Sequence, residues 1–167
     1  MGVLIKDIPV SDGFDFPVGP PDAKKYYDAQ SFQENAHLGE DWNGIGGGNS
    51  DLGDPVFSIA NGIVASAEDW GGGWGNVLRV FHNIGTKAQP NIIESFYAHL
   101  DTMLVQKQDH LRRGDQLGTI GDAYGAYPAH LHFEMRWQAG MVGGGGYSDD
   151  TTGFLNPTVF IKANRPK

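Results

Sequence analysis

Apolar residues occur in short runs from residue 56 onward, and Gly, Pro or Asn-Gly interrupts the chain between runs. Short apolar runs bounded by such residues are typical of β-strands, and no stretch keeps the spacing of a long amphipathic helix. The predicted strands are Val56–Ala60, Ile63–Ala67, Val77–His82, Ile92–Ala98, Gln116–Ile120 and His130–Trp137. We therefore predict an all-β protein built on an antiparallel sheet. The dipeptide Asn61-Gly62 between the first two runs predicts a hairpin.

The last predicted strand separates polar from apolar side chains. Because successive side chains of a strand point to opposite faces, His130, His132 and Glu134 share one face. The opposite, apolar face consists of Leu131, Phe133 and Met135. The sequence therefore predicts a strand that packs on a core with one face and presents two imidazoles on the other.

We predict that residues 1–35 form an irregular lead-in, because Gly and Pro recur between residues 13 and 21 and oppose regular structure. At most a helical turn or two is expected within residues 27–35. We predict two parts, this lead-in and a folded domain over residues 36–167. The sequence leaves open whether the lead-in gates the site.

Length and charge narrow the class of protein. The 167 residues fit one domain, and the net charge of −8 argues against nucleic-acid binding, which depends on Lys and Arg. The same charge argues against electrostatic adhesion to anionic membranes or wall polymers. No run approaches the roughly 20 apolar residues of a membrane span. Lys6, Asp7 and Asp12 interrupt the N-terminal stretch, so no signal peptide is visible in it.

Three glycine clusters lie at residues 46–48, 71–73 and 143–146. One interpretation is that they are flexible loops. The other is that they form walls of a groove, where a missing side chain lets a ligand approach the backbone.

The candidate chemistry is metal binding by His and Asp. The chain has no Cys, so a metal site must use His, Asp or Glu. His37 and Asp41 lie four residues apart, and His99 ends a predicted strand. A catalytic zinc has three protein ligands and an open position, which His37, Asp41 and one of His130 and His132 can supply. The two other histidines remain for acid–base or oxyanion roles.

Three short motifs follow one another along the chain: His37-Leu38-Gly39-Glu40-Asp41, Tyr97-Ala98-His99-Leu100 and His130-Leu131-His132-Phe133-Glu134. Further matching segments are Gly53-Asp54-Pro55-Val56-Phe57, Ala60-Asn61-Gly62-Ile63-Val64, Gly75-Asn76-Val77, Arg113-Gly114-Asp115-Gln116-Leu117-Gly118 and Asn156-Pro157. In this order the motifs resemble the lysostaphin/LytM-type zinc metallopeptidases, which are peptidoglycan endopeptidases. The resemblance covers roughly residues 36 to 160.

The resemblance implies a role for each motif residue. His37, Asp41 and His132 match the ligands of one zinc ion, and His99 and His130 match the two catalytic histidines. It also implies a LytM-like metallopeptidase domain over residues 36–167, with long loops forming a groove over the metal site. Glu134 is either an orienting partner of an imidazole or a structural carboxylate. The two histidines outside the pattern, His82 and His110, are expected to be structural and solvated, respectively.

The resemblance implies a zinc-dependent endopeptidase that hydrolyses peptide bonds in peptidoglycan cross-bridges or stem peptides, outside the cytoplasm. Two alternatives stay open: a catalytically idle, wall-binding regulator of the same fold, and a peptidase that acts on glycine-rich proteins. Two segments depart from the family pattern, namely the insertion Gln138–Gly153 and the longer hairpin loop Ile84–Asn91. Either is expected to reshape the groove. No wall-binding domain is visible, so a targeting partner is a further hypothesis.

Overall fold

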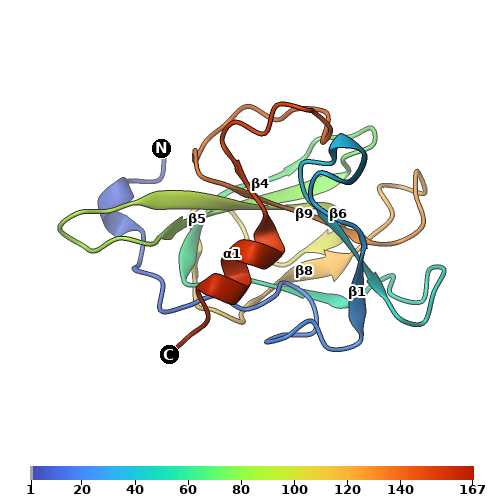
Figure 1. Cartoon of the computed structure of the whole chain (residues 1–167), viewed down its shortest axis with the longest axis horizontal. Helices are drawn as coiled ribbons and strands as arrows, with labels where there is room; N and C mark the ends of the chain where they lie inside the picture. The colour runs from blue at the N-terminus through green and yellow to red at the C-terminus, as the bar shows by residue number, and fades with distance from the viewer. Residues whose placement is uncertain (1) are drawn as a thin grey trace.

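Ten strands make up most of the regular structure in residues 2–167, the part of the chain that the computed structural model describes (Figure 1). The strands are β1 (Tyr26–Gln30), β2 (Glu40–Gly44), β3 (Pro55–Phe57), β4 (Gly62–Asp69), β5 (Asn76–Asn83), β6 (Ile92–Met103), β7 (His110–Leu111), β8 (Gln116–Ile120), β9 (Leu131–Arg136) and β10 (Phe154–Leu155). The helical elements are the 3-10 turns η1 (Ile5–Asp7) and η2 (Glu34–Ala36) and the helix α1 (Pro157–Ala163). No helix in residues 2–167 has the length and apolar character to cross a membrane.

Antiparallel pairing joins the strands. The main order is β1-β2-β9-β6-β5-β4-β7, with β10 beside β9 and with β8 paired to both β3 and β6. Strand β9 therefore lies between β2 and β6, and residues of both neighbours lie beside its side chains. The predicted all-β, antiparallel fold is confirmed.

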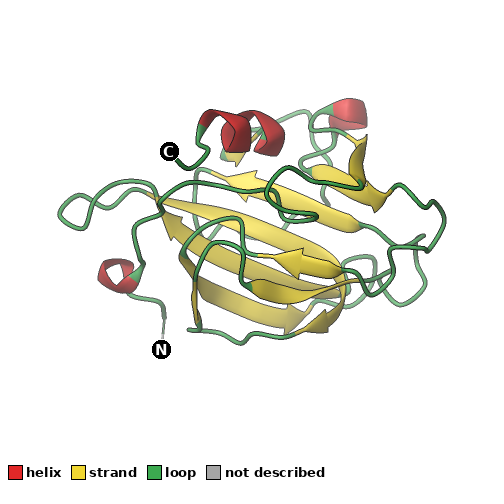
Figure 2. Ribbon diagram, turned by 90° about the horizontal axis from the view of Figure 1, so that it is seen from below, coloured by secondary structure: helices red, strands yellow, loops and turns green. Residues whose placement is uncertain are grey.

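One face of the sheet carries the main hydrophobic core. Leu131, Phe133 and Met135 of β9 are fully buried on this face. Helix α1 lies along one side of the strands in Figure 2 and, with the lead-in, covers this core. The covering side chains are Phe14, Phe16, Val18, Phe160 and Ile161. Burying one large apolar side chain stabilises a fold by about 1.5–3 kcal/mol. The lead-in and helix α1 each bury at least two such side chains, so both segments contribute to the stability of the core.

The opposite face of the central strands is polar and aromatic, and we call it the site face. His132, Glu134 and Arg136 alternate with the core residues of β9, as the period of a strand predicts. Glu94 lies on the same face of β6, and it is completely buried. In the 138–153 insertion the Gly140 N–H donates to Glu94 and the Met141 carbonyl accepts from Arg79, so the insertion covers part of the site face.

All six predicted strands form, but the predicted hairpin at Asn61-Gly62 is wrong. Strand β3 pairs with β8, and β4 pairs with β5 and β7. A type I′ hairpin turn needs positive φ at both central residues, and neither Asn61 nor Gly62 has it. Instead, the Asn61 carboxamide oxygen accepts from the Arg113 N–H at 3.0 Å, and the Asn61 carbonyl lies 2.9 Å from Nδ1 of His82. Contacts with distant segments therefore fix this dipeptide.

The lead-in is more ordered than the sequence predicts. The prediction of irregular structure is wrong for residues 26–30, which form β1 and extend the sheet beside β2. The helical turn expected within residues 27–35 is reduced to η2. Pairing with β2 is a long-range contact that the Gly- and Pro-rich composition does not report.

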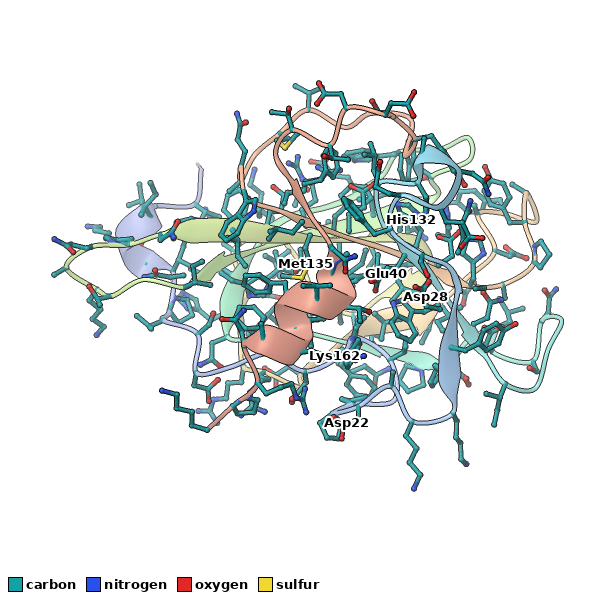
Figure 3. All side chains as sticks on the ribbon, in the orientation of Figure 1. Asp22, Asp28, Glu40, His132, Met135 and Lys162 are labelled. Atoms are coloured by element: carbon teal, nitrogen blue, oxygen red, sulfur yellow. The ribbon has the colours of Figure 1, made fainter. Side chains whose placement is uncertain are left out.

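The sequence prediction also misses helix α1. The Asn156 side chain accepts a hydrogen bond from the Val159 N–H at 3.0 Å, and Pro157 occupies the first helical position. An Asn cap followed by Pro is a recognised start of a helix, so the local signal was present. The Thr158 N–H donates to Glu40 at 2.9 Å, which places the start of α1 beside β2 (Figure 3).

Candidate metal centre and groove

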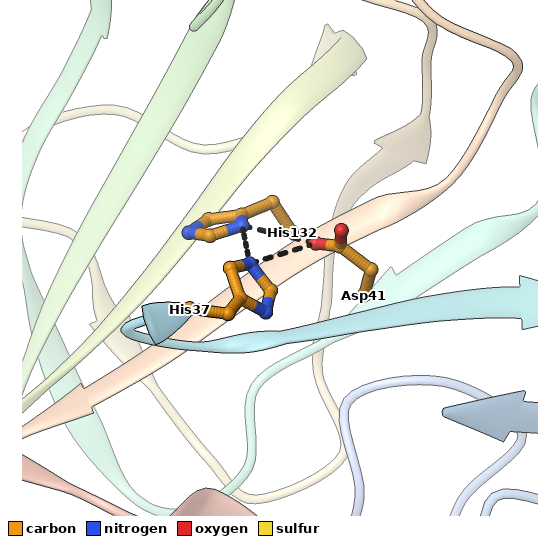
Figure 4. A group of neighbouring side chains, drawn as sticks. All are labelled: His37, Asp41 and His132. Atoms are coloured by element: carbon orange, nitrogen blue, oxygen red, sulfur yellow. Dashed lines mark hydrogen bonds and ion pairs between the residues drawn. The ribbon is translucent and has the colours of Figure 1, made fainter. Parts of the chain in front are cut away.

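Strand pairing brings together three of the predicted site residues. Asp41 on β2 lies directly opposite His132 on β9, and His37 precedes β2. Nε2 of His37 lies 3.1 Å from Nδ1 of His132 and 3.4 Å from Oδ1 of Asp41. Nδ1 of His132 lies 3.0 Å from the same carboxylate oxygen (Figure 4). The three ligand atoms therefore form a small triangle whose members come from two strands and a turn.

The triangle is slightly smaller than a bound zinc ion requires. Zinc binds imidazole nitrogen and carboxylate oxygen at about 2.0–2.2 Å, so neighbouring tetrahedral ligand atoms lie about 3.3–3.6 Å apart. The three observed separations are 3.0, 3.1 and 3.4 Å. Two nitrogens and one carboxylate oxygen are also a ligand set that zinc accepts. His37, Asp41 and His132 therefore fit one divalent ion once the two shorter separations widen by a few tenths of an ångström.

Hydrogen bonds outside the triangle set which ring nitrogen carries a proton. Nδ1 of His37 lies 3.2 Å from the Gln30 carbonyl, and Nε2 of His132 lies 2.9 Å from Oε1 of Glu134. A carbonyl and a carboxylate can only accept, so these two nitrogens donate. The two remaining nitrogens face each other beside the Asp41 carboxylate, so a cation that replaced a proton there would be bound by both lone pairs.

His99 and His130 lie beside this triangle and have the same kind of support. Nδ1 of His99 lies 3.2 Å from the Trp74 carbonyl, and Nδ1 of His130 lies 2.8 Å from the Pro128 carbonyl. In a neutral ring these bonds place the proton on Nδ1 and the lone pair on Nε2, and Nε2 of His130 lies 3.7 Å from Oδ1 of Asp41. The centroids of the His99 and His130 rings are 4.7 Å apart. The structure thus brings together all five predicted site residues.

Burial and charge set the protonation of these groups. Burial lowers the pKa of His99 to about 3, and the charges of His132 and His130 act in the same direction. Burial also opposes the charged form of His132, but its hydrogen bonds to Asp41 and Glu134 outweigh this and raise its pKa to about 9. Burial opposes the charged form of Asp41 as well, and the bonds from His132 and His37 lower its pKa below the usual range. His99 is therefore neutral at neutral pH.

A cavity of about 480 Å³ opens over these residues. Three loops line it beside the site residues: the β4–β5 loop, the loop before β9 and the 138–153 insertion. The lining residues from these loops are Gly73, Trp74, Tyr127, Pro128, Gly145, Gly146 and Tyr147. Two of the three glycine clusters therefore contribute to the groove, as one of the two interpretations of the sequence holds. From residues 2–35 the lining includes Gln30 alone.

The sequence prediction misses three aromatic residues of this groove. Trp74 stacks on His99 at a centroid distance of 6.1 Å, and Tyr127 lies 5.1 Å from the same ring. Tyr147 lies 5.1 Å from the His37 ring, and its hydroxyl donates to Gln30 at 3.0 Å. The only signal for them was their place beside or within glycine-rich segments, which predicts a loop and not its position.

The remaining histidines lie outside the site. His82 is fully buried on the core face, with Nε2 2.7 Å from the Ser95 hydroxyl, and His110 is exposed on β7. The loop Ile84–Asn91 joins β5 to β6 at the end where Asn83 pairs with Ile92, whereas the site lies toward the other end. The expectation that this loop reshapes the groove is therefore wrong, whereas the insertion does line it.

The sequence model of Peptidase family M23 matches residues 40–143, which is more than half of the chain. The lipoprotein NlpD of Yersinia enterocolitica is 37% identical over 90 residues, which cover 54% of this chain and 84% of that sequence. The murein hydrolase activator NlpD of Escherichia coli is 33% identical over 90 residues, which cover 54% of this chain and only 22% of the relative.

Solved structures show the same similarity in three dimensions. A zinc-containing peptidase from Vibrio cholerae has a TM-score of 0.58 and 25% identity, over 75% of this chain and 37% of that chain. The catalytic domain of lysostaphin from Staphylococcus simulans has a TM-score of 0.55 and 21% identity, over 93% of this chain and 92% of that chain.

Proposed function

The chain belongs to peptidase family M23, and from that premise we propose that it is a zinc-dependent endopeptidase acting on peptidoglycan cross-bridges or stem peptides. The observation that carries the proposal is the arrangement of the five site residues. Three ligand atoms lie within 4.8 Å of one another, and two further histidines stand beside them at the floor of a groove. A structural zinc site closes all four positions with protein ligands, whereas a catalytic site keeps one open.

In this proposal His37, Asp41 and His132 hold one zinc ion. A zinc ion held there would act as a Lewis acid and lower the pKa of a bound water to about 7. Glu134 accepts from Nε2 of His132 and so keeps the Nδ1 lone pair directed into the site. The Gln30 carbonyl does the same for His37. These partners fix the ligand rings before an ion arrives.

His99 and His130 are proposed to move protons. Each has Nδ1 tied to a backbone carbonyl and Nε2 available toward the cavity. An imidazole in this state accepts a proton at Nε2 from the attacking water and returns it to the leaving amine. After accepting the proton, the same N–H stabilises negative charge on the scissile carbonyl oxygen.

The location that we propose is extracytoplasmic, where peptidoglycan lies. The names of two relatives, a lipoprotein and a murein hydrolase activator, support an envelope function. The second name also supports an alternative, in which the fold binds and regulates a wall hydrolase without cleaving. The presence of all five site residues in one cluster favours the enzyme. A partner that targets the protein to the wall remains part of the proposal.

Digestion of purified peptidoglycan, with mass spectrometry of the released fragments, tests the proposal. We expect one zinc per chain and cleavage that a chelator abolishes. Asp41→Ala should lose zinc and activity together. His99→Ala should keep zinc and lose about 10²- to 10⁴-fold in rate, the usual range for a general acid–base group. His110→Ala, which changes an exposed histidine outside the site, is the matched control and should keep both properties.

Two outcomes would contradict this assignment. Full activity in His99→Ala would refute its catalytic role. Stoichiometric zinc without hydrolysis of any wall preparation would favour the regulator, and an increase in the rate of an added wall hydrolase would then identify it.

A further inference from the structure

A fully buried carboxylate, Glu94, lies on the site face between two arginines and the start of the insertion. One oxygen accepts from Nε of Arg79 at 2.7 Å and from Nη1 of Arg136 at 3.2 Å. The other accepts from Nη2 of Arg79 at 2.9 Å and from the Gly140 N–H at 2.7 Å. Each oxygen therefore accepts two hydrogen bonds, which is the usual capacity of a carboxylate.

One branch from Glu94 leads to the metal triangle. Arg136 donates to Oε2 of Glu134 through Nε at 2.9 Å and Nη2 at 2.6 Å. Oε1 of Glu134 then accepts from the ring of His132. All of these side chains are at most 5% exposed, so the bonds are shielded from water. The position of the His132 ring thus depends on the charge that holds Arg136 in place.

The second branch leads to the groove wall, by which we mean residues 140–147. Beyond the bond from the Gly140 N–H to Glu94, Nη2 of Arg79 donates to the Met141 carbonyl at 2.7 Å. The wall then packs so closely on Trp70 that a Cβ at Gly143 would lie under 3.0 Å from the indole ring. It ends at Tyr147, whose ring lies over His37.

We propose that Glu94 is a positioning residue that links the metal ligand His132 to the groove wall. The carboxylate orients His132 through Arg136 and Glu134, and it fixes the wall through the Gly140 N–H and Arg79. The consequence for cleavage rests on the proposed function, whereas the effects on zinc and on the wall do not. A ligand and a specificity loop held by one buried charge keep a constant separation, which a groove that positions a peptide bond over the metal requires.

Three variants and two measurements test the linkage. Zinc affinity is measured by competition with a chelator, and the order of the wall by hydrogen exchange of the amides of residues 140–147. Arg79→Met should speed exchange of the wall about tenfold and leave zinc affinity unchanged. Glu134→Gln should weaken zinc about 10- to 100-fold and leave the wall unchanged. Glu94→Gln should weaken zinc binding and speed exchange of the wall. The amide NH₂ of Gln would face the N–H donors of Arg79, Arg136 or Gly140 and could not accept their hydrogen bonds.

Controls separate this linkage from general destabilisation and from the catalytic proposal. Arg112→Met changes an exposed arginine and should move neither measurement. If Glu94→Gln does not fold, Glu94→Asp keeps the charge and shortens the reach, and it should move both measurements in the same direction. A Glu94 variant that moves only one measurement would overturn the linkage.

Activity provides a separate readout. Arg79→Met should raise KM for peptidoglycan fragments several-fold with little change in kcat. If the wild type cleaves nothing, the proposed function fails, and the zinc and exchange measurements still decide the role of Glu94.

Discussion

Gly121→Ala should misplace both proposed catalytic histidines while leaving the metal ligands in place. The Gly121 carbonyl accepts from the His130 N–H at 3.2 Å, and a Cβ on Gly121 would lie under 3.0 Å from backbone atoms of His99, Leu100 and Asp101. Backbone cannot rotate away as a flexible side chain can, so the strands must separate. His99 already has a φ of 62°, a conformation with little freedom to adjust.

The size of the effect follows from this overlap. Inserting one methyl group into a well-packed site costs about 1–3 kcal/mol of unfolding free energy. For a chain of this size each kcal/mol lowers Tm by about 2–4 °C, so Tm should fall by about 2–12 °C. A displacement of about 1 Å at His99 or His130 should lower the rate of cleavage about 10²-fold.

Calorimetry, zinc titration and peptidoglycan digestion measure the three consequences separately. We expect Gly121→Ala to bind one zinc with nearly wild-type affinity, because the backbone atoms nearest to the added Cβ belong to His99, Leu100 and Asp101 and not to the three ligands. Gly2→Ala is the control, since a Cβ there meets no atom within 4 Å, the residue has no positive φ and it lies outside the groove lining. Wild-type activity with a wild-type Tm in Gly121→Ala would refute the reasoning, and loss of zinc would show that the two groups of histidines are not separable.

Two further predictions concern His82, on the core face of the sheet, and Tyr147, in the groove wall. Burial lowers the pKa of His82 to about 4, whereas an unfolded His titrates near 6.5. Between these two pH values the unfolded state therefore binds a proton that the folded state excludes. Neutral His82 contributes about 3 kcal/mol to the free energy of unfolding above pH 6.5, and this contribution is lost as the pH falls through 4. In His82→Gln the slope of unfolding free energy against pH between 6.5 and 4 should decrease, and an unchanged slope contradicts this. Tyr147→Phe removes the hydroxyl that bonds Gln30 and should raise KM about fivefold with zinc affinity unchanged, whereas an unchanged KM would exclude a substrate contact.

The fold was predictable where the pattern is local. The alternation in residues 130–135 assigns each side chain to a face without knowledge of the neighbouring strands, and the structure keeps that assignment. Asn61-Gly62 shows where a local rule fails, since its turn preference gives way to the pairing of β3 with β8. Asn156-Pro157 marks the start of α1, but a helix of seven residues has too few apolar repeats for its period to be recognised in the sequence.

The candidate site divides in the same way. Motifs name the residues that supply the chemistry, because nitrogen and carboxylate ligands are restricted to a few residue types. The groove residues Trp74, Tyr127 and Tyr147 escape prediction, because their place depends on three loops that meet only in the folded chain. The partners that set each imidazole tautomer are mostly backbone carbonyls, which every residue has and no sequence pattern marks.

Those carbonyls bear on the choice between enzyme and regulator. A protein that only held zinc would need the support of His37 and His132, and their ring protons are fixed by Gln30 and Glu134. His99 and His130 receive the same support, from Trp74 and Pro128, although neither belongs to the metal triangle. The two imidazoles lie in the lining of the groove but add no ligand to the metal triangle, and His99 also adopts an unfavourable φ. The free-energy cost of ordering these two rings has a function if both act on a bound peptide. The geometry of His99 and His130 therefore favours catalysis more strongly than the geometry of the metal ligands does.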